Sequence, residues 1–81
     1  MSELVIEYCT ACNYYPRAAS LADTIRSRFG IDVELVRSSG GVFEVKWGNE
    51  LLYSKRKMGR FPEPGEVERT LEDRLSAAGP S

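Results

Sequence analysis

Residues 4–12 read LVIEYCTAC, an apolar run that leads directly into two cysteines three positions apart. The unbroken apolar run is typical of a strand that is covered on both faces, or nearly so. A strand that ends in Cys-x-x-Cys and leads into a helix has the geometry of a thiol–disulfide centre. The two thiols can close a small ring, and the helix N-terminus favours the reactive thiolate. We predict that Cys9 and Cys12 are the catalytic pair, in an accessible loop between the first strand and the first helix, with sulfurs close enough to bridge.

Three other interpretations of the cysteine pair stay open. A structural zinc site needs four ligands, and the chain has no histidine and no third cysteine. Such a site, or an iron–sulfur cluster, would need a dimer that pools two pairs. A structural disulfide is the second interpretation, although so short a loop constrains the unfolded chain little. Two inert buried thiols are the third, since free cysteine often behaves as a small core residue. We predict a redox-active pair and no metal site.

Length and charge limit the classes of protein. The 81 residues suit one domain, which we place at residues 1–78 with a C-terminal tail at 79–81. A net charge of −1 gives no sign of nucleic-acid binding. No segment approaches the ~20 apolar residues of a membrane span, and the N-terminus lacks the pattern of a signal peptide. We therefore expect a soluble cytoplasmic protein, where a lone cysteine pair is more often reactive or metal-binding than a permanent cross-link.

The spacing of apolar residues predicts six elements in the order β-α-β-β-β-α. Strands are expected at 3–8, 31–37, 42–47 and 50–56, and helices at 14–29 and 65–77. The last two strands form a hairpin around Gly48-Asn49, a two-residue turn of the primed type. The first strand, helix and second strand make a right-handed βαβ unit with parallel strands. The expected fold class is α/β in an α+β two-layer form, a four-stranded mixed sheet with two helices on one face. This is the smallest form of the thioredoxin-like fold.

Apolar stripes identify the faces that should form the core. The first helix is expected to bury the stripe Ala18, Leu21, Ala22, Ile25 and Phe29, and the second the stripe Val67, Leu71, Leu75 and Ala78. Asn13 is a good N-cap for the first helix, which would place Pro16 in the first turn, where its missing N–H does no harm. A helix that began near Cys9 would instead be kinked at Pro16.

Three segments resemble the selenoprotein W-related (Rdx) family of thioredoxin-like proteins. The resemblance rests on EYCTACNY at 7–14, GVFEV at 41–45 and ELLYSK at 50–55, and it covers nearly the whole chain. Relatives with selenocysteine carry it at the position of Cys12, so the chain resembles a cysteine form. The resemblance implies a thiol–disulfide oxidoreductase linked to glutathione or thioredoxin. It also implies no bound cofactor, with glutathione as a co-substrate. Unlike thioredoxins, the chain has no proline at 39–42, where they place a cis-proline that holds extended substrates.

Thioredoxins and the selenoprotein W-related family differ in which cysteine of the motif is expected to attack. Thioredoxins use the first cysteine of the motif, whereas the selenium position of the family corresponds to Cys12. If Asn13 caps the helix, Cys12 lies closer to the free N–H groups, and Arg17 is near enough to favour its thiolate. We favour Cys12 as the more reactive thiol and Cys9 as its disulfide partner.

Further residues are candidate contacts with a substrate or partner, which we expect to be a protein or a small thiol or disulfide. They are Tyr14, Tyr15, Arg17, Lys55, Lys57 and Arg60. The basic cluster at 55–60 suits an acidic ligand, such as a glutathione carboxylate or an acidic patch on a partner. Its alternative interpretation is a solvated strand edge that discourages edge pairing.

Two expectations concern association and the class of function. Glu44 and Lys46 should face water on the uncovered side of the sheet, which predicts a monomer or a weak homodimer. The alternative to an oxidoreductase is a non-enzymatic adaptor whose partner binding depends on the thiol state.

Overall fold

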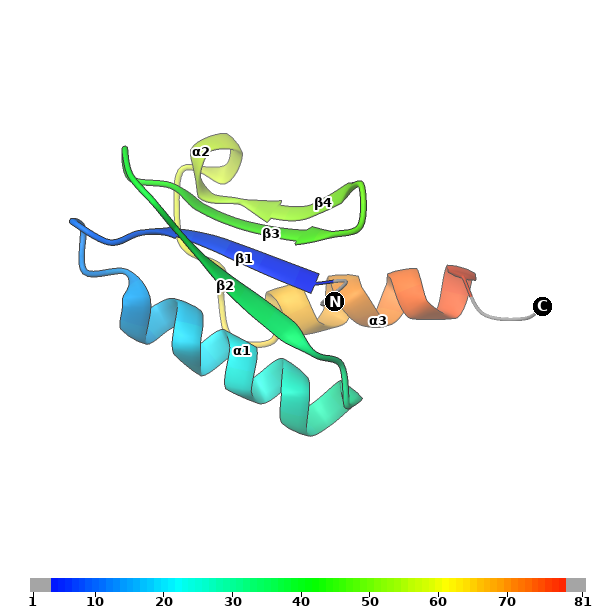
Figure 1. Cartoon of the computed structure of the whole chain (residues 1–81). Helices are drawn as coiled ribbons and strands as arrows, with labels where there is room; N and C mark the ends of the chain where they lie inside the picture. Colours follow the sequence, from blue (N-terminus) through cyan, green and yellow to red (C-terminus); the bar gives the residue numbers. More distant parts are fainter. Residues whose placement is uncertain (1–3, 79–81) are drawn as a thin grey trace.

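The computed structural model describes residues 4–78, with the side chains of residues 4–76. The elements are β1 (Leu4–Cys9), α1 (Tyr15–Phe29), β2 (Val33–Ser38), β3 (Phe43–Trp47), β4 (Glu50–Ser54), α2 (Lys55–Met58) and α3 (Glu66–Ala78), as Figure 1 shows. The expected tail at 79–81 lies outside the described residues.

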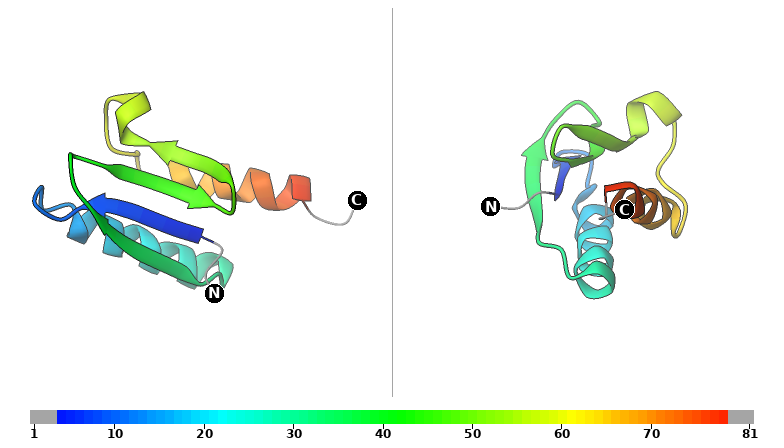
Figure 2. Two further views of the ribbon diagram at one scale, coloured as in Figure 1. Left: turned by 45° about the horizontal axis from the view of Figure 1, so that its top comes forward. Right: turned by 90° about the vertical axis from the view of Figure 1, so that its right-hand side faces the viewer.

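The four strands form one mixed sheet in the order β2-β1-β3-β4. β1 pairs with β2 in parallel and with β3 in antiparallel, so the strand that carries Cys9 is held on both sides. α1 and α3 lie next to each other on one face of this sheet, as the two views of Figure 2 show. The expected fold class, a thioredoxin-like four-stranded mixed sheet with the helices on one face, is confirmed.

The core lies between the sheet and the two long helices. β1 buries Leu4, Ile6 and Tyr8 toward the helices and leaves Val5 and Glu7 only half-buried on the other face. The buried residues of the helices are Ala18, Ala22 and Ile25 of α1 with Val67 and Leu71 of α3, and Leu21, Phe29 and Leu75 pack at the margin. The predicted stripes are thus confirmed, except that the side chain of Ala78 lies outside the described residues.

The chain has a third helix that the apolar pattern did not predict. β4 ends at Ser54 instead of residue 56, and residues 55–58 form the one-turn helix α2. The Ser54 hydroxyl accepts a hydrogen bond from the Lys57 N–H at 3.4 Å, which caps the turn. Gly59 ends it in the left-handed conformation, with φ of 75°. Lys55 and Lys57 therefore lie on a helical turn, and their interpretation as a solvated strand edge is wrong.

The first helix begins one residue later than an Asn13 cap would require. Tyr14 occupies the N-cap position without a side-chain cap, and Pro16 lies in the first turn as predicted. Asn13 takes the left-handed conformation, with φ of 60°, and cannot cap the helix from there. Asparagine is among the residues that adopt this conformation most readily, which explains its place at the end of the cysteine turn.

Two other boundaries differ slightly from those expected. β2 begins at Val33, two residues after its predicted start, although Ile31 still packs against the core. The β3–β4 turn has the predicted two residues. Gly48 has φ of 60° while Asn49 stays negative, which matches the II′ member of the primed turns.

Candidate redox site

The cysteine pair lies where β1 leaves the sheet. Cys9 is the last residue of β1, opposite Ser38 of β2, and its N–H donates to the Val42 carbonyl at 2.8 Å. Cys12 follows in the turn before α1, with its Cα 5.4 Å from that of Cys9, and the two sulfurs are joined as a disulfide. The expectation that the sulfurs lie close enough to bridge is confirmed.

The turn holds the two sulfurs in different environments. Cys9 is only 1% exposed, whereas Cys12 is exposed. The Asn13 N–H donates to the Thr10 carbonyl at 3.1 Å, and the Tyr14 N–H donates to the Cys9 carbonyl at 3.3 Å. The expectation that both thiols lie in an accessible loop is wrong for Cys9, because the backbone pairing of β1 extends through it and keeps it in the sheet.

The first turn of α1 is electrostatically suited to a thiolate. It contains no acidic residue, and its free N–H groups lie directly after the cysteine turn. Arg17, on the same turn, places its guanidinium carbon 4.1 Å from the centre of the Phe61 ring. The partial positive charge of the α1 N-terminus and the charge of Arg17 therefore meet no carboxylate from the first turn of the helix.

An aromatic cluster centred on Phe61 adjoins the cysteine turn. The ring of Phe61 lies 4.8 Å from that of Tyr14 and 5.4 Å from that of Phe43, both edge to face. The Lys55 ammonium lies 5.3 Å from the same ring. The structure thus brings three of the candidate residues, Tyr14, Arg17 and Lys55, around a side chain that sequence reasoning missed. The signal was an isolated aromatic residue in a loop of prolines and charges.

The remaining candidates lie elsewhere. Tyr15 is 54% exposed, with its ring 5.7 Å from that of Tyr8. Lys57 lines a separate, smaller hollow of about 330 Å³ between β4, α2 and α3. Arg60 makes two hydrogen bonds to the carboxylate of Glu66, at 2.8 and 3.0 Å. The basic residues at 55–60 therefore do not converge on one point.

Arg60 and Glu66 clamp the loop between α2 and α3. The Tyr53 hydroxyl donates to the Arg60 carbonyl at 2.6 Å, and the Glu66 carboxylate also accepts the Glu63 N–H at 2.9 Å. The hydrogen bonds from Arg60, and then the one from Glu63, lower the pKa of Glu66 to about 2. The same carboxylate raises the pKa of Arg60. This clamp fixes the loop that carries Phe61.

The clamp predicts a specific pH dependence. A carboxylate whose folded pKa is depressed stabilises the fold above its unfolded pKa and loses that contribution as pH falls through the folded value. For Glu66 the loss should run from about 4.5 down to about 2. NMR titration should place the Glu66 carboxyl near pH 2 in the unmodified chain and closer to its ordinary value in Arg60→Gln, where the Glu63 N–H still donates to it.

Arg74 provides the control position for this titration. It forms an ion pair with Glu50 at 2.7 Å, away from the clamp, so Arg74→Gln should leave the Glu66 midpoint near pH 2. A Glu66 midpoint near 4.5 in the unmodified chain would contradict the clamp.

The described part of the chain offers neither a metal-binding cluster nor a membrane-spanning helix. Within residues 4–78, no three or more His, Cys, Asp or Glu side chains are grouped so that they could hold a metal ion. No helix in that range is long and apolar enough to cross a membrane.

The fold and the site together define a class of protein. A mixed four-stranded sheet whose central strand ends in a bonded Cys-x-x-Cys before a helix is a thioredoxin-like domain with a redox motif. The chain belongs to the Rdx family, whose model matches residues 3–73.

Relatives and solved structures agree with this assignment. A crystal structure of a protein from Bordetella parapertussis has 35% sequence identity and a TM-score of 0.85, over 89% of this chain and 95% of that one. A selenoprotein W-related protein from Vibrio cholerae has 28% identity and a TM-score of 0.84, over 89% and 94%. Migration and invasion enhancer 1 of Bos taurus and that of Mus musculus are each 32% identical over 60 residues, which is 73% of this chain. The chain spans about half the length, 52%, of these two curated relatives.

Proposed function

We propose that the chain is a thiol–disulfide oxidoreductase in which Cys12 attacks and Cys9 resolves. The observation that carries this proposal is the difference in exposure between two bonded cysteines, 1% for Cys9 against an exposed Cys12. An attacking thiol must reach the sulfur of its substrate, whereas a resolving thiol needs only to reach its neighbour. The position of Cys12 nearer the N-terminus of α1 also favours its thiolate.

The proposed reaction is a two-step exchange that conserves electrons. The Cys12 thiolate attacks a substrate disulfide, forms a mixed disulfide and releases one substrate thiolate. The Cys9 thiolate then attacks the Cys12 sulfur, which releases the second substrate thiolate and forms the Cys9–Cys12 disulfide. The two protons of the cysteine thiols pass to the released thiolates, so the substrate gains two electrons and two protons. Two glutathione thiols, or one thioredoxin dithiol, return the pair to the reduced state.

No bound cofactor is needed for this reaction, and we propose glutathione as the co-substrate. Arg17 and Lys55, which flank the Phe61 ring, are the proposed contacts for its carboxylates. Tyr14 and the exposed Tyr15 are proposed contacts for a protein substrate. Arg60 would act through the loop that it fixes, because its guanidinium is already bonded to Glu66. Lys57 would contact only a partner large enough to extend beyond α2.

We also propose that the chain is a monomer or a weak homodimer. The uncovered face of the sheet carries Lys46 at 3.8 Å from Glu7 and 3.9 Å from Glu44, which makes it polar and internally paired. A large obligate interface would need an apolar surface there. Light scattering at nanomolar concentration would overturn this proposal if it found a persistent dimer.

The experiment that tests the enzymatic function combines a redox titration with turnover. We expect the Cys9–Cys12 pair to change state reversibly across glutathione buffers, and the protein to reduce a model disulfide catalytically when glutathione and its reductase are supplied. A non-enzymatic adaptor, which the exposed Tyr15 beside the turn would also suit, should change only its partner affinity on oxidation. A pair that no glutathione ratio can reduce would contradict the oxidoreductase.

A further inference from the structure

A groove runs beside the redox site between α1 and the segment that joins α2 to α3. Its volume is about 600 Å³, which is within the range of ligand sites. The residues that line it are Pro16, Arg17, Ser20, Leu21 and Thr24 of α1, Phe43, and residues 61–65, 67 and 68. Its floor is therefore largely apolar, and it begins at the Phe61 ring, which contacts Tyr14 next to the cysteine turn.

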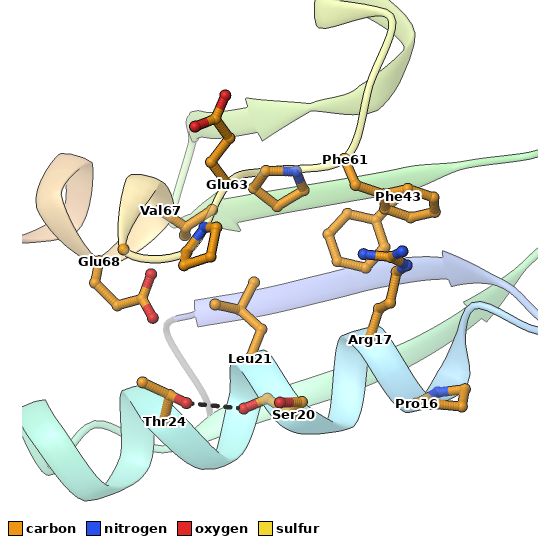
Figure 3. A pocket seen from close by; sticks show the side chains of 13 residues that line it. Pro16, Arg17, Ser20, Leu21, Thr24, Phe43, Phe61, Glu63, Val67 and Glu68 are labelled. Atoms are coloured by element: carbon orange, nitrogen blue, oxygen red, sulfur yellow. Dashed lines mark hydrogen bonds between the residues drawn. The ribbon is translucent and has the colours of Figure 1, made fainter.

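Glu68 is the feature of this groove that packing does not explain. It lies in the first turn of α3 and is only 8% exposed. Figure 3 shows its carboxylate directed across the groove toward Leu21 and Thr24 of α1. Within residues 4–76, this carboxylate makes no hydrogen bond or ion pair. No buried side-chain oxygen of the described residues lacks a hydrogen-bond partner, so the Glu68 oxygens still reach water at the wall of the groove, where they can pair with a cation that enters it.

The charges at the two ends of the groove are opposite. Arg17 lies over Phe61 at the end beside the cysteines, while Glu68 lies at the far end, level with Thr24. Thr24 lies seven positions after Arg17, which corresponds to a rise of about 10 Å along α1. An extended polypeptide covers that length in about three residues. A short stretch of chain therefore fits the groove along its axis.

We propose that the groove binds an extended segment of a polypeptide substrate, with an apolar side chain against Phe61 and Leu21 and a Lys or Arg side chain on Glu68. This inference rests on the proposed oxidoreductase function, because one end of the groove is formed by Pro16 and Arg17 in the first turn of α1, shortly after Cys12, where the chain that flanks the reacting disulfide would pass. It assigns the substrates to proteins with a basic residue near the target cysteine. In thioredoxins a cis-proline helps to hold the extended substrate. The chain has no proline at the matching positions 39–42, and the groove would hold the substrate instead.

The test uses cysteine-free peptides, so that binding is measured apart from exchange. Acetylated and amidated Phe-Ala-Lys, Phe-Ala-Gln and Phe-Ala-Glu are titrated into the oxidised protein and followed by the NMR shifts of the Leu21 and Glu68 amides. Residues two apart in an extended chain face the same way, so Phe and Lys can occupy the groove together. We expect the Lys peptide to bind about tenfold more tightly than the Gln peptide, and the Glu peptide to bind most weakly.

Two variants locate the effect. Glu68→Gln should bring the Lys and Gln peptides within about twofold of each other, since the charge-assisted bond is lost. Glu63→Gln is the matched control, because Glu63 also lines the groove but its carboxylate points away from α1 in Figure 3. It should retain the tenfold preference. Glu68→Asp, which keeps the charge on a shorter side chain, should retain part of it. Because the peptide series is measured on the unmodified chain, its result does not depend on whether any variant folds.

The outcomes separate this inference from the proposed function. Equal binding of the three peptides to the unmodified chain would overturn the groove proposal, and so would equal binding of butylamine and the Lys peptide. Turnover of a model disulfide would stand in both cases. Conversely, selective binding of the Lys peptide by a chain without turnover would support the groove as a polypeptide site while the redox function failed.

Discussion

Cys12→Ser should abolish disulfide reduction, whereas Cys9→Ser should retain a fast-reacting thiol and accumulate mixed disulfide with glutathione. The reason is that Cys12 is exposed near the N-terminus of α1, while Cys9 is 1% exposed within the sheet. In iodoacetamide labelling at neutral pH, the thiol left in Cys9→Ser should react at least about tenfold faster than the one left in Cys12→Ser. Mass spectrometry would identify the glutathione adduct.

Two controls make this result specific to the folded protein. In denaturant both variants should label at similar rates, because the difference comes from burial and the helix. Ala11→Ser, a change at an exposed position of the same turn, should leave turnover intact. Faster labelling of the thiol retained in Cys12→Ser would assign the attack to Cys9, as in thioredoxins.

Phe43→Ala should produce the largest loss of stability among the substitutions considered. Phe43 is 1% exposed and is among the largest fully buried side chains, and its ring supports that of Phe61. Truncating a buried phenylalanine costs ~3–5 kcal/mol, because apolar contact is lost and a cavity remains. Small domains are stable by only ~5–15 kcal/mol, so this change should lower the melting temperature by roughly 15 °C or more.

Urea denaturation would measure this loss directly. The midpoint should fall while the slope stays the same, since the extent of the unfolded surface is unchanged. Tyr15→Ala removes another aromatic ring, but one that is 54% exposed, and should change stability by only about 0.5 kcal/mol. Equal losses in the two variants would contradict the described core.

The order of strands and helices was predictable because its signals are local. The alternation in β3 and the stripes at three and four residues in α1 and α3 each reflect a single element with one buried face. The turn at Gly48 and the end of α1 at Gly30 were predictable for a similar reason, since both need a backbone conformation that glycine adopts readily. The position of Cys-x-x-Cys between β1 and α1 followed from these boundaries.

The missed features have a different physical origin. The short helix α2 is too brief for an apolar period, and it depends on the Ser54 cap and the Gly59 terminus. Asn13 has a side chain suited to an N-cap, but hydrogen bonds within the cysteine turn place the residue in the left-handed conformation instead. Both cases concern hydrogen bonds of single residues, which outweigh general propensity at the ends of elements.

The residues in order were thus sufficient to indicate a thioredoxin-like domain with a redox motif, because periodicity, turn residues and the cysteine spacing are properties of neighbouring positions. The exposure of each thiol could not be predicted, since Cys9 is held in the sheet by its pairing with Ser38 of β2 and by its N–H bond to the Val42 carbonyl just before β3. Three further features could not be predicted either: the Phe61 cluster, the Arg60–Glu66 clamp and the groove that ends at Glu68. These features need α1, the 59–65 loop and α3 packed on the same face of the sheet, and such contacts form only when the whole chain has folded.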